Sequence, residues 1–356
     1  MTTDANGSVI FERVRKAYGS FAVIPDLSLT IEPGTLVTLL GPSGCGKTTT
    51  LRMLAGLEHP TSGKIMIGGK DVTMLPANER DVSMVFQSYA LFPHMTIGDN
   101  VAYGLESSGL RKADAREKAA HALGLVGLKD LDHRLPAELS GGQQQRAAVA
   151  RSLVLEPQVL LLDEPLSNLD ARLRRKVRTE IRELQQRLGF TAVYVTHDQE
   201  EALAVSDQII IMKEGGIAQK GSLRDLFETP ASSFVADFMG EANVLSCLVA
   251  EATDNQAVVE IEGLRHCLNA RNPKRGLAKL AVRPNAIKLT VGGEAGTFLG
   301  KVLHSAYLGN HVEYEIETKV GTLYVVDSDA QTPMVPSTDV TIALKNHGVA
   351  LISDVP

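Results

Sequence analysis

A glycine-rich loop between an apolar run and a helix-favouring segment constrains this fold more than any other feature. The loop follows Leu36–Leu40 and has the spacing G-x-x-x-x-G-K-S/T: Gly41-Pro42-Ser43-Gly44-Cys45-Gly46-Lys47-Thr48. Glycines permit a tight turn whose backbone N–H groups point at phosphate oxygens, and the helix that follows presents its positive end to the same anion. Lys47 can reach the β- and γ-phosphates of a nucleotide, and the Thr48 hydroxyl can bind Mg²⁺. The pattern predicts a strand, a phosphate-binding loop and a helix, with a chance glycine-rich turn as the alternative.

Two adjacent carboxylates follow a second apolar run. Val159–Leu162 is continuously apolar and leads directly into Asp163 and Glu164. At the end of a strand beside a phosphate-binding loop, Asp163 is placed to hold Mg²⁺. Glu164 can then accept a proton from the attacking water or orient it. Acid pairs at strand ends also cap helices, but the loop upstream favours the catalytic interpretation.

The pattern of apolar runs predicts an α/β domain with a largely parallel sheet through about residue 240. Uninterrupted apolar strands are expected where helices cover both faces of a sheet. A charged stretch without Gly or Pro, Arg172–Arg187, predicts a helix that ends at Gly189. The candidate strands are Leu36–Leu40, Val159–Asp163, Thr191–Thr196 and Gln208–Met212.

A second anion-binding helix start is predicted at Leu139-Ser140-Gly141-Gly142-Gln143, which precedes helix-forming residues up to Arg151. Ser140 is the predicted N-cap, and the two glycines leave the backbone of the first turn open. One nucleotide in one subunit does not need two such sites. This segment therefore indicates an edge that completes the nucleotide site of a partner.

In their order along the chain, with the loop at residues 41–48, the capped glycine segment at 139–143 and the acids at 163–164, the three motifs resemble those of the ABC ATPase family. The resemblance implies a P-loop NTPase fold with a helical subdomain, and ATP hydrolysis with ATP and Mg²⁺ as cofactors. It identifies Gln87 as the Q-loop glutamine, Ser167–Asp170 as the D-loop and His197 as the switch histidine that senses the γ-phosphate. It also identifies Tyr18 as the aromatic that stacks on adenine, although simple packing is the alternative.

The implied site residues fall into three groups. The catalytic residues are Glu164, His197 and Gln87, and the Mg²⁺ ligands are Thr48, Gln87 and Asp163. Cys45 fills space in the loop or is a thiol open to modification. The nucleotide contacts are Tyr18, Gly41, Pro42, Ser43, Gly44, Cys45, Gly46, Lys47, Thr48, Thr49, Ser140, Gly141, Gly142, Gln143 and Asp170.

The character of the chain changes after residue 240. Short Val/Ile/Tyr-rich segments separated by turn residues, such as Val312–Ile316 and Thr322–Val326, predict a small all-β barrel. We therefore expect domains at residues 1–240 and 241–356. The second resembles the OB-like TOBE domain that follows some ABC ATPases. Its Arg283-Pro284-Asn285 resembles an Arg-Pro-Glu turn, from which Asn285 departs.

Composition excludes several classes of function. The chain has 356 residues, 44% hydrophobic and 22% charged, and no apolar run approaches the roughly 20 residues that span a bilayer. Residues 1–4 show no signal-peptide pattern. The net charge of −6, and a C-terminal part without a basic, aromatic face, argue against a nucleic-acid partner. The three cysteines have neither metal-ligand nor disulfide spacing. We expect a peripheral protein on the cytoplasmic side of the inner (plasma) membrane.

Two longer stretches, Asp81–Thr96 and Asp163–Arg174, resemble the ATPases of maltose, polyamine, ferric-iron and sulfate importers. The resemblance implies a homodimer that closes head to tail, ABC transporter membrane subunits, and a periplasmic or extracellular solute-binding protein. Residues 88–96 would help receive a helix of the membrane subunit, with Tyr89, Leu91 and Phe92 as exposed contacts or as core.

The solute is predicted to be ferric iron or polyamine, with a sugar, sulfate or phosphonate as alternatives. An ABC ATPase without a transport role, such as a DNA-repair or translation factor, is disfavoured because the chain has neither a long coiled-coil insertion nor a second ATPase cassette. An exporter subunit is disfavoured by the β-rich C-terminal part.

Overall fold

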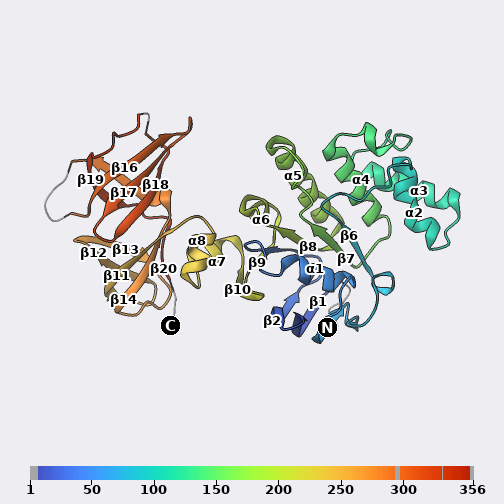
Figure 1. The fold of residues 1–356 in the computed structure, drawn as a ribbon, viewed down its shortest axis with the longest axis horizontal. Helices are drawn as coiled ribbons and strands as arrows, with labels where there is room; N and C mark the ends of the chain where they lie inside the picture. The colour runs from blue at the N-terminus through green and yellow to red at the C-terminus, as the bar shows by residue number, and fades with distance from the viewer. Residues whose placement is uncertain (1–6, 293–296, 331, 353–356) are drawn as a thin grey trace. The chain divides into compact units, whose positions relative to one another are not determined.

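A computed structural model describes residues 7–292, 297–330 and 332–352 (Figure 1). Residues 1–4, for which the sequence shows no signal-peptide pattern, lie outside these ranges. Contacts divide the chain into two compact units, Met1–Lys220 and Gly221–Pro356. No helix in the described ranges is long and apolar enough to cross a membrane.

The first unit is built on a six-stranded sheet with the strand order β10-β9-β3-β8-β7-β6. The pairs β3–β8, β3–β9, β6–β7 and β7–β8 are all parallel, which confirms the predicted, largely parallel sheet. The strands are β3 (Leu36–Leu40), β6 (Val82–Val85), β7 (Val159–Asp163), β8 (Thr191–Thr196), β9 (Gln208–Lys213) and β10 (Gly216–Gly221).

Both faces of this sheet are buried, which explains why its strands read as continuous apolar runs. In β7, Leu160 and Leu162 pack into one hydrophobic cluster, whereas Val159 and Leu161 pack into another on the opposite face. The first cluster includes α5 (Ala171–Leu188), and the second includes α1 (Lys47–Ala55). The predicted helix before Gly189 is confirmed, and Gly189 ends it with a left-handed φ of 69°.

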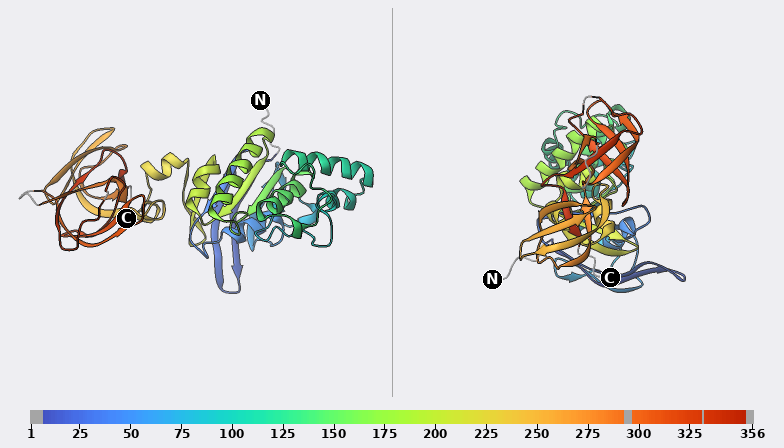
Figure 2. Two further views of the ribbon diagram at one scale, coloured as in Figure 1. Left: turned by 90° about the horizontal axis from the view of Figure 1, so that it is seen from above. Right: turned by 90° about the vertical axis from the view of Figure 1, so that its left-hand side faces the viewer.

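An antiparallel sheet packs into the second cluster and was not predicted from the sequence. Its order is β2-β1-β4-β5, from Phe21–Ile31, Val9–Tyr18, Ser62–Ile67 and Lys70–Asp71. The β1–β2 pairing is interrupted by several register shifts, so the alternation of apolar residues that would reveal these strands is broken. Figure 2 shows the β1–β2 hairpin extending from the body of the first unit.

The predicted helical subdomain is confirmed. It contains α2 (Ile97–Ser107), α3 (Lys112–Leu125) and α4 (Gly141–Leu153), which lie side by side in Figures 1 and 2. Their apolar faces, including Val101, Ala119 and Ala147, join the same hydrophobic cluster as α5. The helix α4 therefore connects this subdomain to the central sheet.

The second unit begins with α7 (Leu223–Glu228) and α8 (Ser233–Phe238) and is otherwise β-rich, as predicted. It forms two five-stranded antiparallel sheets, rather than one continuous sheet, which share one large hydrophobic cluster. The first sheet has the order β13-β12-β11-β14-β20, from Leu264–Asn269, Gln256–Ile261, Asn243–Ala252, Gly276–Val282 and Val349–Ile352. The second has the order β15-β19-β16-β17-β18, from Ile287–Val291, Asp339–Leu344, Leu299–Tyr307, Val312–Thr318 and Gly321–Asp327.

The Arg283-Pro284-Asn285 turn attaches α7 and α8 to the β-rich part. Arg283 is buried, donates hydrogen bonds to the carbonyl oxygens of Ala236 and Phe227, and lies 4.0 Å from the Phe227 ring centroid. Burial lowers the pKa of its guanidinium to about 10. Contacts thus group both helices with the second unit, whereas the sequence places the domain boundary after them. The boundary at residue 240 stays a prediction.

Candidate nucleotide site

The glycine-rich loop lies at the C-terminal end of β3 and leads directly into α1. Gly44 and Gly46 have φ values of 80° and 100°, which side-chain-bearing residues rarely adopt. A Cβ on Gly46 would also lie 2.4 Å from Ile24 Cδ1. No side chain caps the start of α1, so its first N–H groups remain available to an anion.

Lys47 is a buried cation held only by neutral groups. It is 6% exposed, and its Nζ donates to the carbonyl oxygens of Gly41 (2.7 Å) and Pro42 (3.0 Å). Among the described residues, no carboxylate forms an ion pair with it. A buried charge is costly without a counter-charge. The loop therefore fits a phosphate group, with the partly buried Thr48 and Thr49 in the same helical turn.

The acid pair lies at the end of β7. Burial raises the pKa of Asp163, and the neighbouring negative charge of Glu164 raises it further. A nearby cation would offset both effects. The predicted Mg²⁺ ligands offer oxygen atoms, which Mg²⁺ prefers, and their small number suits an ion that keeps water and phosphate ligands. The described part of the chain holds no cluster of three or more His, Cys, Asp or Glu side chains that could bind a metal without such ligands.

The structure brings Glu164 and His197 together. His197 Nδ1 lies 3.3 Å from Glu164 Oε2. Glu164 has a left-handed φ of 43°, and its N–H donates to the Val195 carbonyl oxygen of the neighbouring strand. Its own carbonyl accepts from Ser167 Oγ at 3.0 Å. These bonds hold the backbone of Glu164 in an unfavourable conformation, which is typical of functional positions.

The D-loop contacts the Q-loop through one side chain. Asn168 Nδ2 donates to the Gln87 carbonyl oxygen at 2.9 Å, and the exposed Gln87 side chain remains free to reach a ligand. Asp170 caps α5, because its Oδ1 accepts from the N–H groups of Arg172 and Leu173. If Asp170 also contacts the nucleotide, as predicted, its carboxylate must cap α5 and bind the nucleotide at the same time.

Ser140 is the N-cap of α4, as predicted. Its Oγ accepts from the Gln143 N–H at 3.4 Å, while Gln143 Oε1 accepts from the Ser140 N–H at 2.9 Å. This reciprocal pair leaves other N–H groups of the first turn open. No hydrogen bond or ion pair between described residues joins residues 140–143 to the loop at 41–48. The loop leads into α1, which packs into the second hydrophobic cluster, whereas α4 packs into the first, on the other face of the sheet.

The glycines of this segment allow α4 to pack closely against the D-loop and α5. A Cβ on Gly141 would lie 3.0 Å from Leu169 Cδ2, and a Cβ on Gly142 would lie 2.8 Å from Leu173 Cδ1. Both distances are shorter than ordinary van der Waals contact. The start of α4 is therefore positioned by residues that flank Asp170.

Gly142→Ala is expected to lower ATP hydrolysis about tenfold, because the added methyl group displaces the start of α4. The gain in helix propensity, up to about 1 kcal/mol, offsets the local strain, so the free energy of unfolding should change little. Steady-state hydrolysis and urea unfolding measure the two effects. Gly124→Ala in α3 is the control: nothing lies within 4 Å of its Cβ, and its hydrolysis should stay unchanged. Equal activity of both variants would contradict the packing argument.

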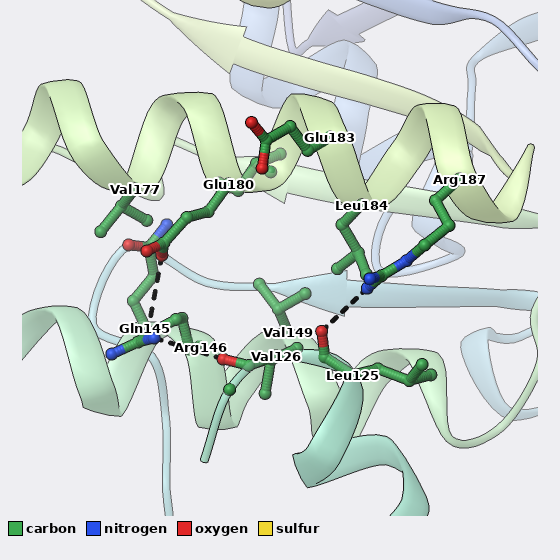
Figure 3. A pocket seen from close by; sticks show the side chains of 12 residues that line it. Leu125, Val126, Gln145, Arg146, Val149, Val177, Glu180, Glu183, Leu184 and Arg187 are labelled. Carbon is green, nitrogen blue, oxygen red and sulfur yellow. Dashed lines mark hydrogen bonds and ion pairs between the residues drawn. The ribbon is translucent and has the colours of Figure 1, made fainter.

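A pocket of about 210 Å³ lies between α4 and α5 (Figure 3). Gln145 from α4 extends toward Val177 and Glu180 of α5, and both polar atoms of its fully buried amide lack a hydrogen-bond partner among the described residues. Arg146 Nε and Glu180 Oε2 are 3.7 Å apart, beyond hydrogen-bond distance. Several buried polar atoms between these two helices therefore lack hydrogen-bond partners among the described residues.

Gln145→Leu is expected to raise the free energy of unfolding by about 1 kcal/mol, because it removes a buried amide without partners. Gln144→Leu is the matched control. Its amide donates to the carbonyl oxygens of Pro136 and Leu139, so this neighbouring change should destabilise the protein. Urea unfolding at fixed pH compares the two. A loss of stability in Gln145→Leu would mean that the amide has a partner, such as bound water.

Tyr18 and Tyr89 differ in exposure. Tyr18 is 50% exposed at the end of β1, where its hydroxyl donates to Glu58 and Lys16 Nζ lies 4.8 Å from its ring centroid. Its ring can therefore still receive an adenine base. Of the two alternatives for Tyr89, exposed contact or core, the structure supports the core: Tyr89 is 6% exposed, because the loop turns inward through left-handed conformations at Tyr89 and Ala90. Leu91 and Phe92 are partly buried.

Sequence reasoning did not predict the contacts by which three residues support these loops. Asn168 contacts the Q-loop, and Arg174 and Glu201 contact the segment around His197. Asp198 is the N-cap of α6 (Gln199–Val205) and accepts from the Glu201 N–H, so the spacing of the two acids indicates the helix start but not the bonds of the Glu201 carboxylate to β8. The contacts of Asn168 and Arg174 span the fold and have no local signature.

Comparison with known proteins agrees with this geometry. Residues 24–167 match the model of the ABC transporter family, and residues 280–352 match that of the TOBE domain. A protein from Rhizobium etli and one from Agrobacterium fabrum, both named Fe(3+) ions import ATP-binding protein, are each 70% identical, with 99% of this chain and at least 99% of each relative covered. A protein of the same name from Pasteurella multocida is 47% identical, with 98% of both chains covered.

A solved structure also resembles the first unit. It is the dimeric ATP-binding cassette MJ0796 in a post-hydrolysis state, bound to ADP and Pi. It is 31% identical, has a TM-score of 0.54, and covers 61% of this chain and 99% of its own. Two kinds of evidence thus agree. The structure contains the phosphate-binding loop, the acid pair with its histidine and the capped glycine segment, and relatives are 70% identical over nearly the full length. The chain therefore belongs to the ABC transporter family of ATP-binding proteins.

Proposed function

We propose that this chain is the ATP-hydrolysing subunit of an importer for ferric iron. The observation that carries the ATPase chemistry is the pair formed by Glu164 and His197, 3.3 Å apart at the sheet edge that also bears the phosphate-binding loop. The solute is supported by relatives named Fe(3+) ions import ATP-binding protein at 70% identity. Polyamine, the other predicted solute, has no such support.

In the proposed mechanism, the residues of this chain mainly position the reactants. Lys47 and the open N–H groups of α1 bind the phosphates, and Tyr18 stacks on the base. Glu164 accepts a proton from the attacking water, and His197 hydrogen-bonds the γ-phosphate and holds the glutamate side chain. Mg²⁺, when bound, neutralises charge on the phosphate oxygens, and Asp163, Thr48 and Gln87 would hold it.

The separation of the two anion-binding edges supports a homodimer. The loop at residues 41–48 leads into α1 on one face of the central sheet, whereas Ser140–Gln143 begin α4, which packs on the other face. We propose that each ATP is bound between the loop of one subunit and Ser140–Gln143 of the other, with Asp170 nearby. The dimeric ADP-bound cassette that resembles the first unit supports this arrangement.

The remaining parts of the proposal concern location and partners. The chain is placed on the cytoplasmic side of the plasma membrane, bound to membrane subunits through the surface around residues 88–96. Phe92 and Tyr103 are candidate contacts there: their ring centroids are 4.9 Å apart, and Tyr103 is 48% exposed. An external solute-binding protein would deliver the iron. The β-rich second unit stays without an assigned role.

The test is affinity purification of the tagged chain from native membranes, followed by mass spectrometry. We expect a polytopic membrane protein and an external binding protein, and the purified binding protein should bind Fe³⁺ in preference to spermidine. Preference for spermidine, sulfate or a sugar would overturn the solute. Recovery of ribosomal or DNA-repair proteins without a membrane protein would overturn the transport role but not the ATPase chemistry.

A further inference from the structure

A buried carboxylate lies directly behind the loop that carries His197. Glu201, in the first turn of α6, is 3% exposed, and its Oε2 accepts from the hydroxyls of Thr196 (2.8 Å) and Tyr194 (3.0 Å) of β8. Burial raises the pKa of this carboxyl, although the two hydroxyl bonds act in the opposite direction. A buried acid with well-formed partners fixes the elements that it joins.

These contacts hold the backbone on both sides of His197. Thr196 donates to Glu201 and, through the same Oγ1, accepts from the Asp198 N–H at 3.0 Å. Asp198 in turn accepts from the Glu201 N–H at 3.1 Å through its Oδ1. The imidazole itself is 61% exposed, and among the described residues its side-chain partner is Glu164. Its position is therefore set mainly by the backbone of the residues before and after it.

Arg174 extends this network to the D-loop. Its Nη1 lies 3.3 Å from Asp198 Oδ2, and its Nε lies 3.6 Å from Glu201 Oε1. Its Nη2 donates to the Leu169 carbonyl oxygen at 3.1 Å. One guanidinium thus contacts the loop of His197, the buried acid and the residue before Asp170.

We propose that Glu201 is a positioning residue for ATP hydrolysis: its buried carboxylate holds Thr196 and Asp198 so that His197 meets Glu164, and Arg174 aligns this loop with the D-loop. The inference rests on the proposed role of His197. It assigns no contact between Glu201 and the nucleotide. Loss of Glu201 should therefore affect the chemical step rather than nucleotide binding.

Glu201→Gln tests the proposal because an amide cannot satisfy both sides of the site. If the amide oxygen accepts from Thr196 and Tyr194, its NH₂ group faces Arg174 Nε, and the two donors oppose each other. If the amide turns around, the two hydroxyls lose their acceptor. We expect kcat for ATP to fall at least about tenfold while KM stays within about twofold. Glu200→Gln, an exposed neighbour on the same helix, should leave both constants unchanged.

A double-mutant cycle separates positioning from general loss of structure. In a His197→Ala background, Glu201→Gln should cause no further fall in the single-turnover rate, because the residue acts through the missing imidazole. An equal fall in both backgrounds, or a wild-type kcat in Glu201→Gln, would overturn the inference. An inactive wild-type protein would instead overturn the proposed function. If Glu201→Gln does not fold, Tyr194→Phe removes one hydroxyl donor and should give the same pattern with a smaller effect.

Discussion

Glu164→Gln is expected to lower ATP hydrolysis by about 10²- to 10⁴-fold while ATP still binds, because the variant keeps the shape of the side chain but loses the base. The change leaves the backbone bonds to Val195 and Ser167 intact. A dimer that binds ATP without hydrolysing it should accumulate. Phosphate release measures the rate, and size-exclusion chromatography with and without ATP measures the dimer.

Glu156→Gln is the matched control for this change. Glu156 also has a left-handed φ, of 53°, but its carboxylate is 79% exposed and pairs with Lys118 on the surface. Its loss should leave hydrolysis unchanged. Wild-type hydrolysis by Glu164→Gln would contradict the assignment of Glu164 as the base. A variant that neither hydrolyses nor binds ATP would show that the side chain supports the site structurally.

Lys47→Ala is expected to weaken ATP binding at least about 30-fold, which corresponds to about 2 kcal/mol. Lys47 is buried, and its partners among the described residues are neutral: two carbonyl oxygens and the Cys45 sulfur, so the phosphate is its natural counter-charge. Without the ammonium group, the phosphates lose a charge-assisted bond in a site shielded from water. Isothermal titration calorimetry with ATP and Mg²⁺ measures the affinity.

Lys64→Ala controls for the loss of one positive charge, because Lys64 is exposed on β4. It should bind ATP as the wild type does. Thermal unfolding without nucleotide confirms that both variants fold. Tight ATP binding by Lys47→Ala would contradict the proposed role of the lysine and would assign phosphate binding to the backbone of the loop.

Much of the site could be predicted because its residues are close in sequence. The phosphate-binding loop, the acids after Val159–Leu162 and the capped helix at Ser140 each combine a local pattern with a local physical role. The parallel sheet was predictable because strands buried on both faces are continuously apolar. The predicted helix up to Arg187 and the β-rich character after residue 240 were equally local inferences.

The features that sequence reasoning missed depend on contacts between distant segments. Asn168 and Gln87 are 81 positions apart in the sequence, and no local pattern predicts the hydrogen bond between them. The sequence left open whether Tyr89 is exposed or core, because the inward turn of the loop that buries it has no local pattern. The antiparallel sheet was not predicted because register shifts in β1 interrupt the alternation of apolar and polar residues.

The bond from Asn168 Nδ2 to the Gln87 carbonyl oxygen also limits how strongly two events can influence each other. One end belongs to the loop after β6, directly before residues 88–96, which are proposed to meet the membrane subunit. The other end belongs to the D-loop, whose Asp170 is proposed to lie near the nucleotide between the two subunits. If docking at one loop changes affinity at the other through this bond alone, the linkage free energy cannot exceed what the bond contributes, about 1 kcal/mol. That is roughly a fivefold change in affinity, equal in both directions. A coupling of this size is small enough to be lost again each time that ATP is hydrolysed.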